Sequence, residues 1–517
     1  MNKAVSVEVA DVLAAIPARL HQVVDRFSRE TPDHPALVED GMVWSYRQLA
    51  DSIPAIAAAL RSLGVRAGDR MMIVSENCIA LAGLLLAASS IDAWAIVVNP
   101  RLSPRELDQI RDHSGARRIF LTGAISKEAS AHVERYGATV QAVGPLEGIG
   151  VSTLNADTLA EAVENDSAKQ VAVLIYTSGT TGTPKGVMLS HQNLLFSAMT
   201  TARFRTMDTR DKIYVVLPIS HIVGISLLLM TLMTGGTVRL VSKYDPAALV
   251  NALAHEGITV LNGVPATYQR LLEYQTVSGI GKINKGSLRL IGVAGAPLDL
   301  DLKSRVEREL NLSLLNGYGI TECAPGISGV RYDAPRSDEA VGKILPGVEA
   351  RLVGRDGAAV AQGEVGELHV RGLNVMLGYY RAPDLTQKAI DRDGWFNTGD
   401  LARFDGDAMY IVGRTKEMII RSGFNVYPAE VEAVLNSHDA VVQSAVVGRP
   451  IDGNEEVVAF VQLLQGTKVT PSDLMTYVGQ QLTSYKRPSQ IVVLDALPAT
   501  STGKILKHKL AETLRAS

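Results

Sequence analysis

The chain has 517 residues, more than one hydrophobic core usually organises, so two or more domains are expected. Hydrophobic residues at 46% and charged residues at 20% describe an ordinary soluble globular protein. The 51 Lys and Arg residues nearly balance the 54 Asp and Glu residues, and the net charge of −3 gives no electrostatic argument for binding nucleic acid.

A few residues bear on compartment and membrane association. Cys78 and Cys323 are the only cysteines, which suggests neither a disulfide framework nor a metal cluster and fits a reducing, cytoplasmic compartment. Glu8 and Asp11 precede any apolar run, so a secretory signal is not expected. Residues 81–98 are apolar, but Asp92 interrupts them, and a helix followed by a strand explains them as well as a membrane span does. We expect buried core and no transmembrane segment.

From Ala36 onward, short apolar runs alternate with amphipathic stretches. Ser45 is a plausible cap for a helix that runs toward residue 63. The pattern then predicts strands at 71–74, 94–98 and 119–121, and helices at 79–88 and 104–113. After a polar stretch at 155–170, a second series has predicted strands at 171–176, 214–217, 238–241, 259–261 and 290–293, and helices at 222–233, 246–255, 267–274 and 300–310. Such alternation indicates parallel sheets, so we predict an α/β fold with two subdomains and a cleft between them.

The pattern changes twice in the last part of the chain. Residues 348–412 are β-rich, with short apolar runs separated by Gly and Asp turns. From Lys416, the predicted order is strand, helix, strand, strand, helix and strand, which fits a small α+β domain. These elements are expected at 417–420, 428–435, 441–447, 457–463, 471–482 and 491–494. We therefore predict an N-terminal domain of residues 1–415, with a β-rich subdomain at its end, and a C-terminal domain of residues 416–517.

A run of glycine and hydroxyl residues follows the predicted strand at 171–176. It comprises Thr177, Ser178, Gly179, Thr180, Thr181 and Gly182, and it leads through Thr183 and Pro184 to Lys185. Glycines let backbone N–H groups approach an anion closely, hydroxyls add donors, and the lysine supplies a positive charge. The run predicts a polyphosphate site, although a flexible surface loop has a similar composition. It is not a Walker A loop, because Gly186 rather than Ser or Thr follows the lysine. Ser190 is expected to cap a helix that begins near His191.

The whole string IYTSGTTGTPKGVMLSH, residues 175–191, resembles the phosphate-binding signature of the adenylate-forming enzymes. That superfamily includes acyl-CoA synthetases, adenylation domains of peptide synthetases and luciferases. The resemblance extends along the chain to Lys504. It implies a large AMP-binding domain followed by a small, mobile C-terminal domain.

A second motif, NGYGITE at residues 316–322, directly follows a short apolar run. Its glycines permit a tight turn, Tyr318 offers a flat face, and Glu322 offers a carboxylate of the kind that binds Mg²⁺ beside a polyphosphate. An ordinary turn with an exposed Glu is the alternative. The resemblance implies that Tyr318 stacks on adenine, Thr321 contacts the α-phosphate and Glu322 binds magnesium, with Thr180 as a further metal ligand. It implies nucleotide contacts also for Asn316, Gly317, Gly319, Gly295, Ala296 and Pro297.

Asp400 closes a polar turn at residues 393–400. One carboxylate can accept two hydrogen bonds from a ribose diol, and a simple turn cap is the alternative. The resemblance implies the ribose contact, with Arg414 as its partner.

The C-terminal domain carries three features that the resemblance interprets. Lys416 occupies the position of a hinge residue. Gly423 and Phe424 match a loop that forms the entry path of the coenzyme A thiol. Lys504 lies in a Gly/Ser/Thr loop and matches the lysine that orients the substrate carboxylate against the α-phosphate. Lys507 and Lys509, which follow it, are expected to be solvated surface lysines.

His221 precedes an apolar helix, where a lone histidine is more often packed than catalytic. The resemblance places this segment against the acyl substrate, so the predicted acyl pocket consists of His221, Ile222, Gly224, Asn262 and Gly317. The segments that match the pocket, at 221–226, 262–264, 294–295, 317–319 and 323–328, contain no Arg or Lys. A dicarboxylate such as malonate would lack a partner there for its second charge. An aromatic or medium-chain aliphatic monocarboxylic acid is therefore expected.

The resemblance implies a ligase that joins a small-molecule carboxylic acid to coenzyme A through an acyl-AMP, using ATP and Mg²⁺. Lys185 and the hydroxyl loop would hold the β- and γ-phosphates, and Lys504, Thr321 and Glu322 would act at the α-phosphate. Catalysis of this kind depends mainly on positioning and electrostatics. An enzyme that loads a free-standing carrier protein, a luciferase-type oxygenase and a non-catalytic nucleotide-binding regulator are the alternatives. We expect a monomer or a homodimer.

Overall fold

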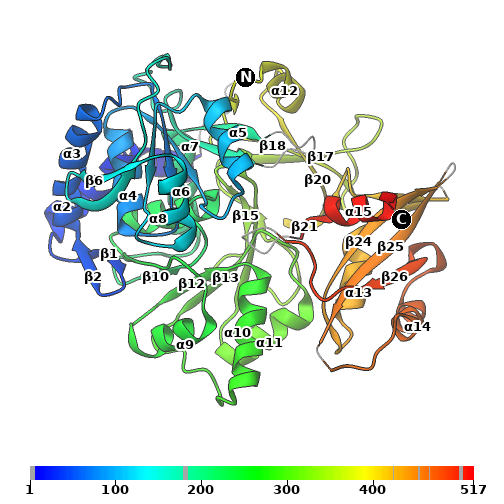
Figure 1. Ribbon diagram of the computed structural model, residues 1–517. Coiled ribbons are helices and arrows are strands. Elements are labelled where there is room, and N and C mark those ends of the chain that lie inside the picture. Colours follow the sequence, from blue (N-terminus) through cyan, green and yellow to red (C-terminus); the bar gives the residue numbers. More distant parts are fainter. Residues whose placement is uncertain are drawn as a thin grey trace.

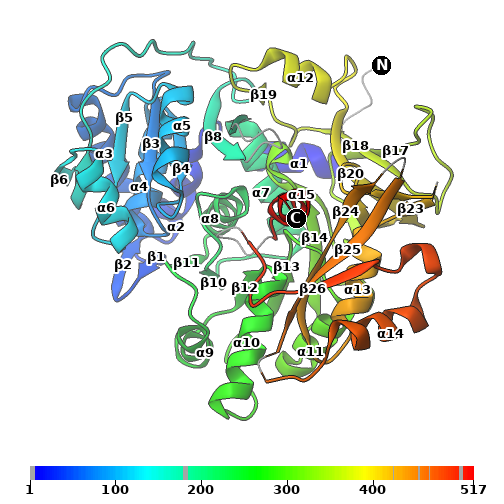
Figure 2. The same ribbon diagram turned by 45° about the vertical axis from the view of Figure 1, so that its right-hand side comes forward.

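The computed structural model describes residues 6–177, 184–422, 424–451, 454–464, 466–499 and 505–516 (Figure 1). Two large sheets and a smaller one form the bulk of the molecule, and a separate small unit contains the C-terminal part (Figures 1 and 2). The hydroxyl loop from Ser178 to Gly182, together with Gly423 and Lys504, lies outside the described residues.

The first large sheet has eight strands. In spatial order they are β19 (Gly378–Tyr379), β9 (Lys185–Ser190), β8 (Val171–Thr177), β4 (Trp94–Val98), β3 (Arg70–Val74), β5 (Arg118–Leu121), β7 (Leu146–Val151) and β6 (Thr139–Val143). The strands β8, β4, β3 and β5 are parallel, as the alternating pattern predicted. The outer strands are antiparallel to their neighbours.

The second large sheet has nine strands. In spatial order they are β16 (Lys343–Ile344), β15 (Gly326–Gly329), β14 (Leu314–Gly319), β13 (Leu290–Val293), β12 (Val260–Gly263), β10 (Lys212–Val215), β11 (Thr237–Leu240), β1 (Pro35–Glu39) and β2 (Met42–Ser45). The run from β14 to β1 is parallel. The carboxyl ends of β12, β13 and β14 therefore meet at one edge of the sheet, where ligands of such sheets bind.

The two sheets exchange strands, so they do not correspond to two consecutive series in the sequence. The first strand of the chain, β1, pairs with β11 in the second sheet. Strand β8, which begins the second predicted series, lies in the first sheet beside β4, and β9 lies beside β8. Strand β9 is also an addition to the prediction, which passed directly from the hydroxyl loop to a helix at His191. These pairings depend on contacts between distant segments, which local patterns do not report.

The helices that the sequence pattern predicted are present with similar bounds, whereas the helices Val7–Ala15, Asp25–Glu30, Lys127–Arg135 and Pro383–Ala389 were not predicted. In chain order they are α1 (Val7–Ala15), α2 (Asp25–Glu30), α3 (Tyr46–Ser62), α4 (Ile79–Ser90), α5 (Pro104–Ser114), α6 (Lys127–Arg135), α7 (His191–Phe204), α8 (Ile222–Thr234), α9 (Pro246–His255), α10 (Pro265–Ser278), α11 (Leu300–Leu310), α12 (Pro383–Ala389), α13 (Pro428–Asn436), α14 (Pro471–Gln481) and α15 (Lys507–Ala516). Ser45 caps α3 and Ser190 caps α7, each through a bond from the backbone N–H three residues on, which confirms both predicted caps.

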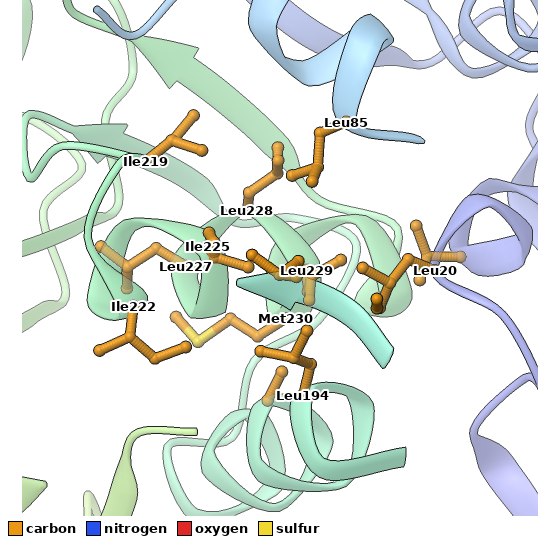
Figure 3. Close-up of a cluster of buried hydrophobic side chains, with 14 of the residues drawn as sticks. Leu20, Leu85, Leu194, Ile219, Ile222, Ile225, Leu227, Leu228, Leu229 and Met230 are labelled. Carbon is orange, nitrogen blue, oxygen red and sulfur yellow. The ribbon is translucent and has the colours of Figure 1, made fainter. Parts of the chain in front are cut away.

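The most apolar helices, α4 and α8, lie inside the molecule. Both are hydrophobic on every side, as expected of helices that are covered all round. Figure 3 shows α8 surrounded by side chains of α7, of α4 and of the N-terminal segment around Leu20. Residues 81–98 comprise most of α4 and the whole of the buried strand β4. The prediction that this apolar stretch is buried core is confirmed. Among the described helices, none is long and apolar enough to cross a membrane.

The β-rich segment forms a four-stranded antiparallel sheet of β17 (Val348–Val353), β18 (Gly366–Gly372), β20 (Phe396–Asp405) and β21 (Ala408–Arg414). The small C-terminal unit follows, with the hairpin β22 (Ile419–Arg421) and β23 (Phe424–Val426) and the sheet β24 (Val441–Ile451), β25 (Asn454–Leu463) and β26 (Gln490–Val493). Its apolar clusters begin at Ile419 and share no buried side chain with the main core among the described residues.

Candidate active site

Tyr318, Asp400 and Arg414 meet at one end of strand β14. Asp400 and Arg414 face each other across the β20–β21 ladder, and Arg414 Nε lies 3.0 Å from Asp400 Oδ1. The Tyr318 hydroxyl donates to Asp400 Oδ2 at 2.5 Å, although the two residues are 82 positions apart. Burial, and then the charge of Asp400, hold the pKa of Tyr318 well above its ordinary value, so the phenol keeps its proton. Three residues predicted to contact adenosine thus form one cluster.

Glu322 lies in a short helical turn, Thr321–Cys323, directly after β14. Its Oε1 accepts a hydrogen bond at 3.0 Å from the hydroxyl of Tyr379, and its backbone oxygen accepts one from Met376 N. Burial, followed by the Glu322 charge, raises the pKa of Tyr379 far above its usual range. Tyr379 belongs to β19, the edge strand of the other large sheet. The contact therefore ties the end of β14 to the first sheet.

Lys185 is the first residue of β9 and faces Thr177, the last residue of β8. This register brings the two ends of the hydroxyl loop together. Lys185 Nζ lies 5.3 Å from the centroid of the Tyr379 ring. The hydroxyl of the same tyrosine donates to Glu322. A cavity of about 150 Å³ opens here, lined by His113, Pro184, Lys185, Tyr379, Tyr380, Ala382 and Leu385. The lysine predicted to hold phosphate and the carboxylate predicted to hold magnesium thus flank one tyrosine.

The described residues fit a magnesium site that has few protein ligands. Mg²⁺ keeps several waters and takes one or two carboxylates plus substrate phosphates, rather than a cage of protein ligands. Glu322 supplies one such carboxylate, and no group of three or more His, Cys, Asp or Glu side chains gathers elsewhere in the described ranges. Thr180, the other predicted ligand, lies outside those ranges.

The segment Gly295, Ala296 and Pro297 follows β13, next to the end of β14. Gly295 has φ +86°, a conformation that favours glycine. A Cβ on Gly319 would approach the oxygen of Pro325 to 2.2 Å, so glycine is also required there. The side-chain nitrogen of Asn316 donates to the backbone oxygen of Glu339 at 2.9 Å, which anchors this strand. Direct contact between Asn316 and a nucleotide stays a prediction.

Cys323 carries no nucleophilic role in this arrangement. It is fully buried, and burial, followed by the charge of Glu322, raises the pKa of its thiol well above the ordinary value. The thiol is therefore protonated and enclosed.

The residues predicted for the acyl pocket lie around the start of α8 and the facing strands. His221 precedes α8, and Gly224 is required because a Cβ there would come within 2.2 Å of the Pro218 oxygen. Ile222 is 1% exposed and packs in the main core (Figure 3). Asn262 in β12 and Gly317 in β14 lie on the sheet face that carries this core.

One residue of this region was missed from the sequence. Arg205, at the end of α7, lies in none of the pocket-matching segments, yet its Nη1 donates to Asn262 Oδ1 at 2.5 Å. Its Nη2 lies 3.6 Å from where a Cβ on Gly317 would stand. A cation therefore adjoins two predicted pocket residues, although the pocket segments themselves contain none. A weak signal was available, since Ala198, Ala202 and Arg205 fall on one buried face of α7.

The linkage to the small C-terminal unit runs through residues 415–420. Thr415 N donates to Gly399 O at 3.0 Å and its hydroxyl to Glu367 Oε1 at 2.9 Å, whereas Ile420 N donates to Glu455 Oε2 at 2.6 Å. The chain thus passes from one unit to the other across the exposed Lys416.

Of the other residues predicted to matter in the C-terminal unit, the structure describes Phe424, Lys507 and Lys509. Phe424 is 55% exposed and stacks on Tyr485, with ring centroids 4.7 Å apart. Ala499 and Ile505, which lie on either side of the segment that contains Lys504 in the sequence, pair with each other in an antiparallel bridge. Lys507 corrects an expectation, because it is not a solvated lysine: its Nζ lies 2.7 Å from Glu432 and 3.2 Å from Glu417, and its side chain is 20% exposed. Lys509 is exposed, as predicted.

Comparison with known proteins decides the family. Residues 24–380 match the family model described as AMP-binding enzyme, and residues 430–504 match the AMP-binding enzyme C-terminal domain. The chain belongs to the AMP-binding enzyme family. The resemblance read from residues 175–191 is thereby confirmed.

Named relatives of this AMP-binding enzyme include several ligases of coenzyme A. A feruloyl-CoA synthase of Amycolatopsis sp is 35% identical over 491 residues, covering 94% of this chain and 97% of the relative. A long-chain-fatty-acid–CoA ligase of Escherichia coli O157:H7 is 33% identical, covering 98% and 97%. Among solved structures, ATP-bound MatB from Rhodopseudomonas palustris superposes with a TM-score of 0.85 at 30% identity, covering 96% of this chain and 99% of MatB. The o-succinylbenzoate coenzyme A synthetase MenE of Bacillus subtilis, with ATP and magnesium, gives 0.80 at 28% identity, covering 95% and 99%.

Proposed function

We propose that this enzyme converts a carboxylic acid into its coenzyme A thioester through an acyl-AMP intermediate, at the expense of ATP. The observation that carries the proposal is the adjacency of two clusters at the end of β14. Tyr318, Asp400 and Arg414 form a polar group suited to adenosine. Glu322 and Lys185 meet through Tyr379 and are suited to a phosphate chain. The relatives named as coenzyme A ligases cover nearly the whole chain, which supports the same chemistry.

In the first half-reaction, the acid's carboxylate would attack the α-phosphorus and pyrophosphate would leave. Asp400 would accept the ribose hydroxyls, with Arg414 fixing its orientation, and Tyr318 would lie against adenine. Lys185 and the hydroxyl loop would neutralise charge on the β- and γ-phosphates. Glu322 would hold Mg²⁺, which supplies charge neutralisation to the phosphates when bound. Thr321, followed in the chain by Glu322, would donate to the α-phosphate.

In the second half-reaction, the thiol of coenzyme A would attack the acyl carbonyl and AMP would leave. The proposed entry path runs past Gly423 and Phe424, and the high exposure of Phe424 is compatible with this role. Lys504, on the same unit, would serve the first half-reaction instead. Two such groups on one small unit need that unit to present different faces in turn.

We therefore propose that residues 416–517 rotate against residues 1–415 about Lys416. Thr415 is bonded to the large unit and Ile420 to the small one, so the intervening residues are the natural place for the backbone to turn. The contacts that cross between the units and would have to break include Gln269 Nε2 to Val442 O and Arg355 Nη2 to Asn425 Oδ1. Both are single polar contacts that water replaces readily.

A panel of carboxylic acids tests this function by pyrophosphate release, with and without coenzyme A. We expect release to depend on the acid, and the corresponding thioester to form with coenzyme A as the sole acceptor. Acyl-AMP formation without any thioester would instead favour a carrier protein as acceptor. Absence of acid-dependent release across aromatic and aliphatic acids would refute the proposal.

A further inference from the structure

Arg205 is a buried cation at the edge of the predicted acyl pocket. The residue is 8% exposed, and burial lowers the pKa of its guanidinium, which nevertheless stays charged. Its Nη1 lies directly over Gly292 of β13, where a Cβ would stand 2.1 Å away. Only a glycine at that position admits the guanidinium between α7 and the sheet.

The polar groups around Arg205 are incompletely satisfied. Across the described ranges, no carboxylate forms an ion pair with Arg205, and its one hydrogen-bond acceptor is Asn262 Oδ1. The Nδ2 of Asn262 is itself buried and finds no acceptor among the residues that the structure describes. A buried charge without a counter-charge and a buried amide nitrogen without an acceptor are both costly, because water no longer compensates them.

Other buried cations in the same molecule have their partners. Arg70, 1% exposed, donates to the backbone oxygens of Ser114, Gly68 and Leu159 and lies 3.7 Å from Glu161. Lys303, also 1% exposed, donates to Leu314 O and pairs with Glu307. Arg70 and Lys303 therefore have a structural role. Among the described residues, Arg205 differs from them in having no carboxylate beside it and a single acceptor, Asn262 Oδ1, which points to an external acceptor.

The position of Arg205 and Asn262 in the fold relates these two residues to the acid rather than to the nucleotide. Gly317 adjoins Arg205, and the next residue, Tyr318, bonds Asp400 at the adenosine end. Tyr318, near the end of strand β14, thus belongs to the cluster suited to adenosine. Gly317, one residue earlier, adjoins Arg205 on the face of the strand toward α7. An acid lying along this strand would direct its reacting carboxylate to the phosphates and its far end to Arg205 and Asn262.

We propose that Arg205 and Asn262 bind an oxygen acceptor at the far end of the acid substrate. This inference rests on the proposed function and narrows its substrate class. The shared chemistry is an oxygen that accepts from a guanidinium and an amide N–H, as in a ring hydroxyl or methoxyl group or a second carboxylate. Acids that end in a bare ring or a methyl group leave both donors unpaired and are poor substrates.

The test compares acids in matched pairs on wild-type enzyme. One arm uses an aromatic acid with and without a ring hydroxyl at the far end, and the other uses a dicarboxylic acid and the monocarboxylic acid of equal length. Acid-dependent pyrophosphate release gives kcat and KM separately, and thermal shift in the presence of AMP gives binding without turnover. We expect the acceptor-bearing acid of one pair or both to be preferred on the order of 10- to 100-fold in kcat/KM, chiefly through KM.

Variants separate a recognition role from a structural one. Arg205→Met and Asn262→Leu should abolish the preference within each pair, and Arg205→Lys should restore part of it. Arg203→Met, on the exposed side of the same helix, is the matched control and should change nothing. AMP binding and melting temperature report whether each variant folds.

The outcomes are distinct. A preference confined to one arm identifies the acceptor as a ring oxygen or as a second carboxylate, and either result supports the inference. Equal kcat/KM within both pairs, or a preference that survives in folded Arg205→Met, overturns it. Absence of pyrophosphate release with every acid would instead refute the proposed function. The thermal shifts measured with AMP would then still show whether Arg205 determines which acid binds.

Discussion

Replacing Asp400 with Asn tests the adenosine cluster most sharply, because this carboxylate connects strands from two sheets. Asp400 is 3% exposed, accepts a hydrogen bond from Tyr318 and pairs with Arg414. Asn has nearly the same shape and keeps one acceptor oxygen. The substitution therefore removes the charge and one acceptor without leaving a cavity.

The expected effect on ATP binding is large, and the effect on folding is small. A hydrogen bond to a charged group contributes about 1.5–3 kcal/mol, so losing one to the ribose should raise the KM for ATP roughly 10- to 150-fold. The burial of Asp400 favours the upper part of this range. The side chain of Arg414 is 46% exposed, so solvent screens the ion pair. We expect the free energy of unfolding to fall by only about 1 kcal/mol.

The assay measures acid-dependent pyrophosphate release against ATP concentration at a saturating acid. Asp405→Asn is the matched control, because Asp405 is exposed at the other end of the same strand and should leave the KM for ATP unchanged. Equal KM values for ATP in wild type and Asp400→Asn, with both proteins folded, would refute the assignment of Asp400 to the ribose.

Three further changes test other parts of the account. Lys504→Ala should suppress acyl-AMP formation far more than thioester formation from supplied acyl-AMP, with Lys509→Ala as the control, and equal losses in both half-reactions would count against domain alternation. Gly224→Ala should destabilise the fold by about 1–3 kcal/mol in thermal unfolding, since its Cβ would come 2.2 Å from Pro218 O, whereas Gly281→Ala, which has open space, should be nearly neutral. Burial lowers the pKa of His191 from 6.5 to about 3, so the unfolded chain takes up a proton that the folded one refuses, and stability is lost as pH falls below about 6.5. At pH 5 the contribution of His191 to this loss is about 2 kcal/mol relative to pH 7, and His191→Gln should remove that contribution whereas His255→Gln, at an exposed position, should keep it.

Features set by local sequence were predictable. Ser45 and Ser190 cap their helices as expected, because the capping bond joins residues three positions apart. The helices α9 and α11 begin and end at the predicted residues, since each begins after a clear start signal. Strand β9 was missed because six residues without strict alternation look like the approach to a helix.

Features set by distant contacts were not predictable from pattern alone. The adjacency of Tyr318 and Asp400 was expected only through resemblance to a known family, since 82 residues separate them. The pair Arg205 and Asn262, 57 residues apart, had no such guide. An arginine at the end of a helix is usually at the surface, where it faces the negative end of the helix dipole. Its burial depends on the glycine in β13 that makes room for it.

We propose that the clusters around Tyr318 and Lys185 bind ATP and an acid together for adenylate transfer. Exchange of labelled pyrophosphate into ATP measures the reversal of that step and needs no coenzyme A. We expect exchange that requires both an acid and Mg²⁺ and that weakens in Asp400→Asn. Absence of exchange with every aromatic and aliphatic acid, from a folded protein that binds ATP, would contradict it.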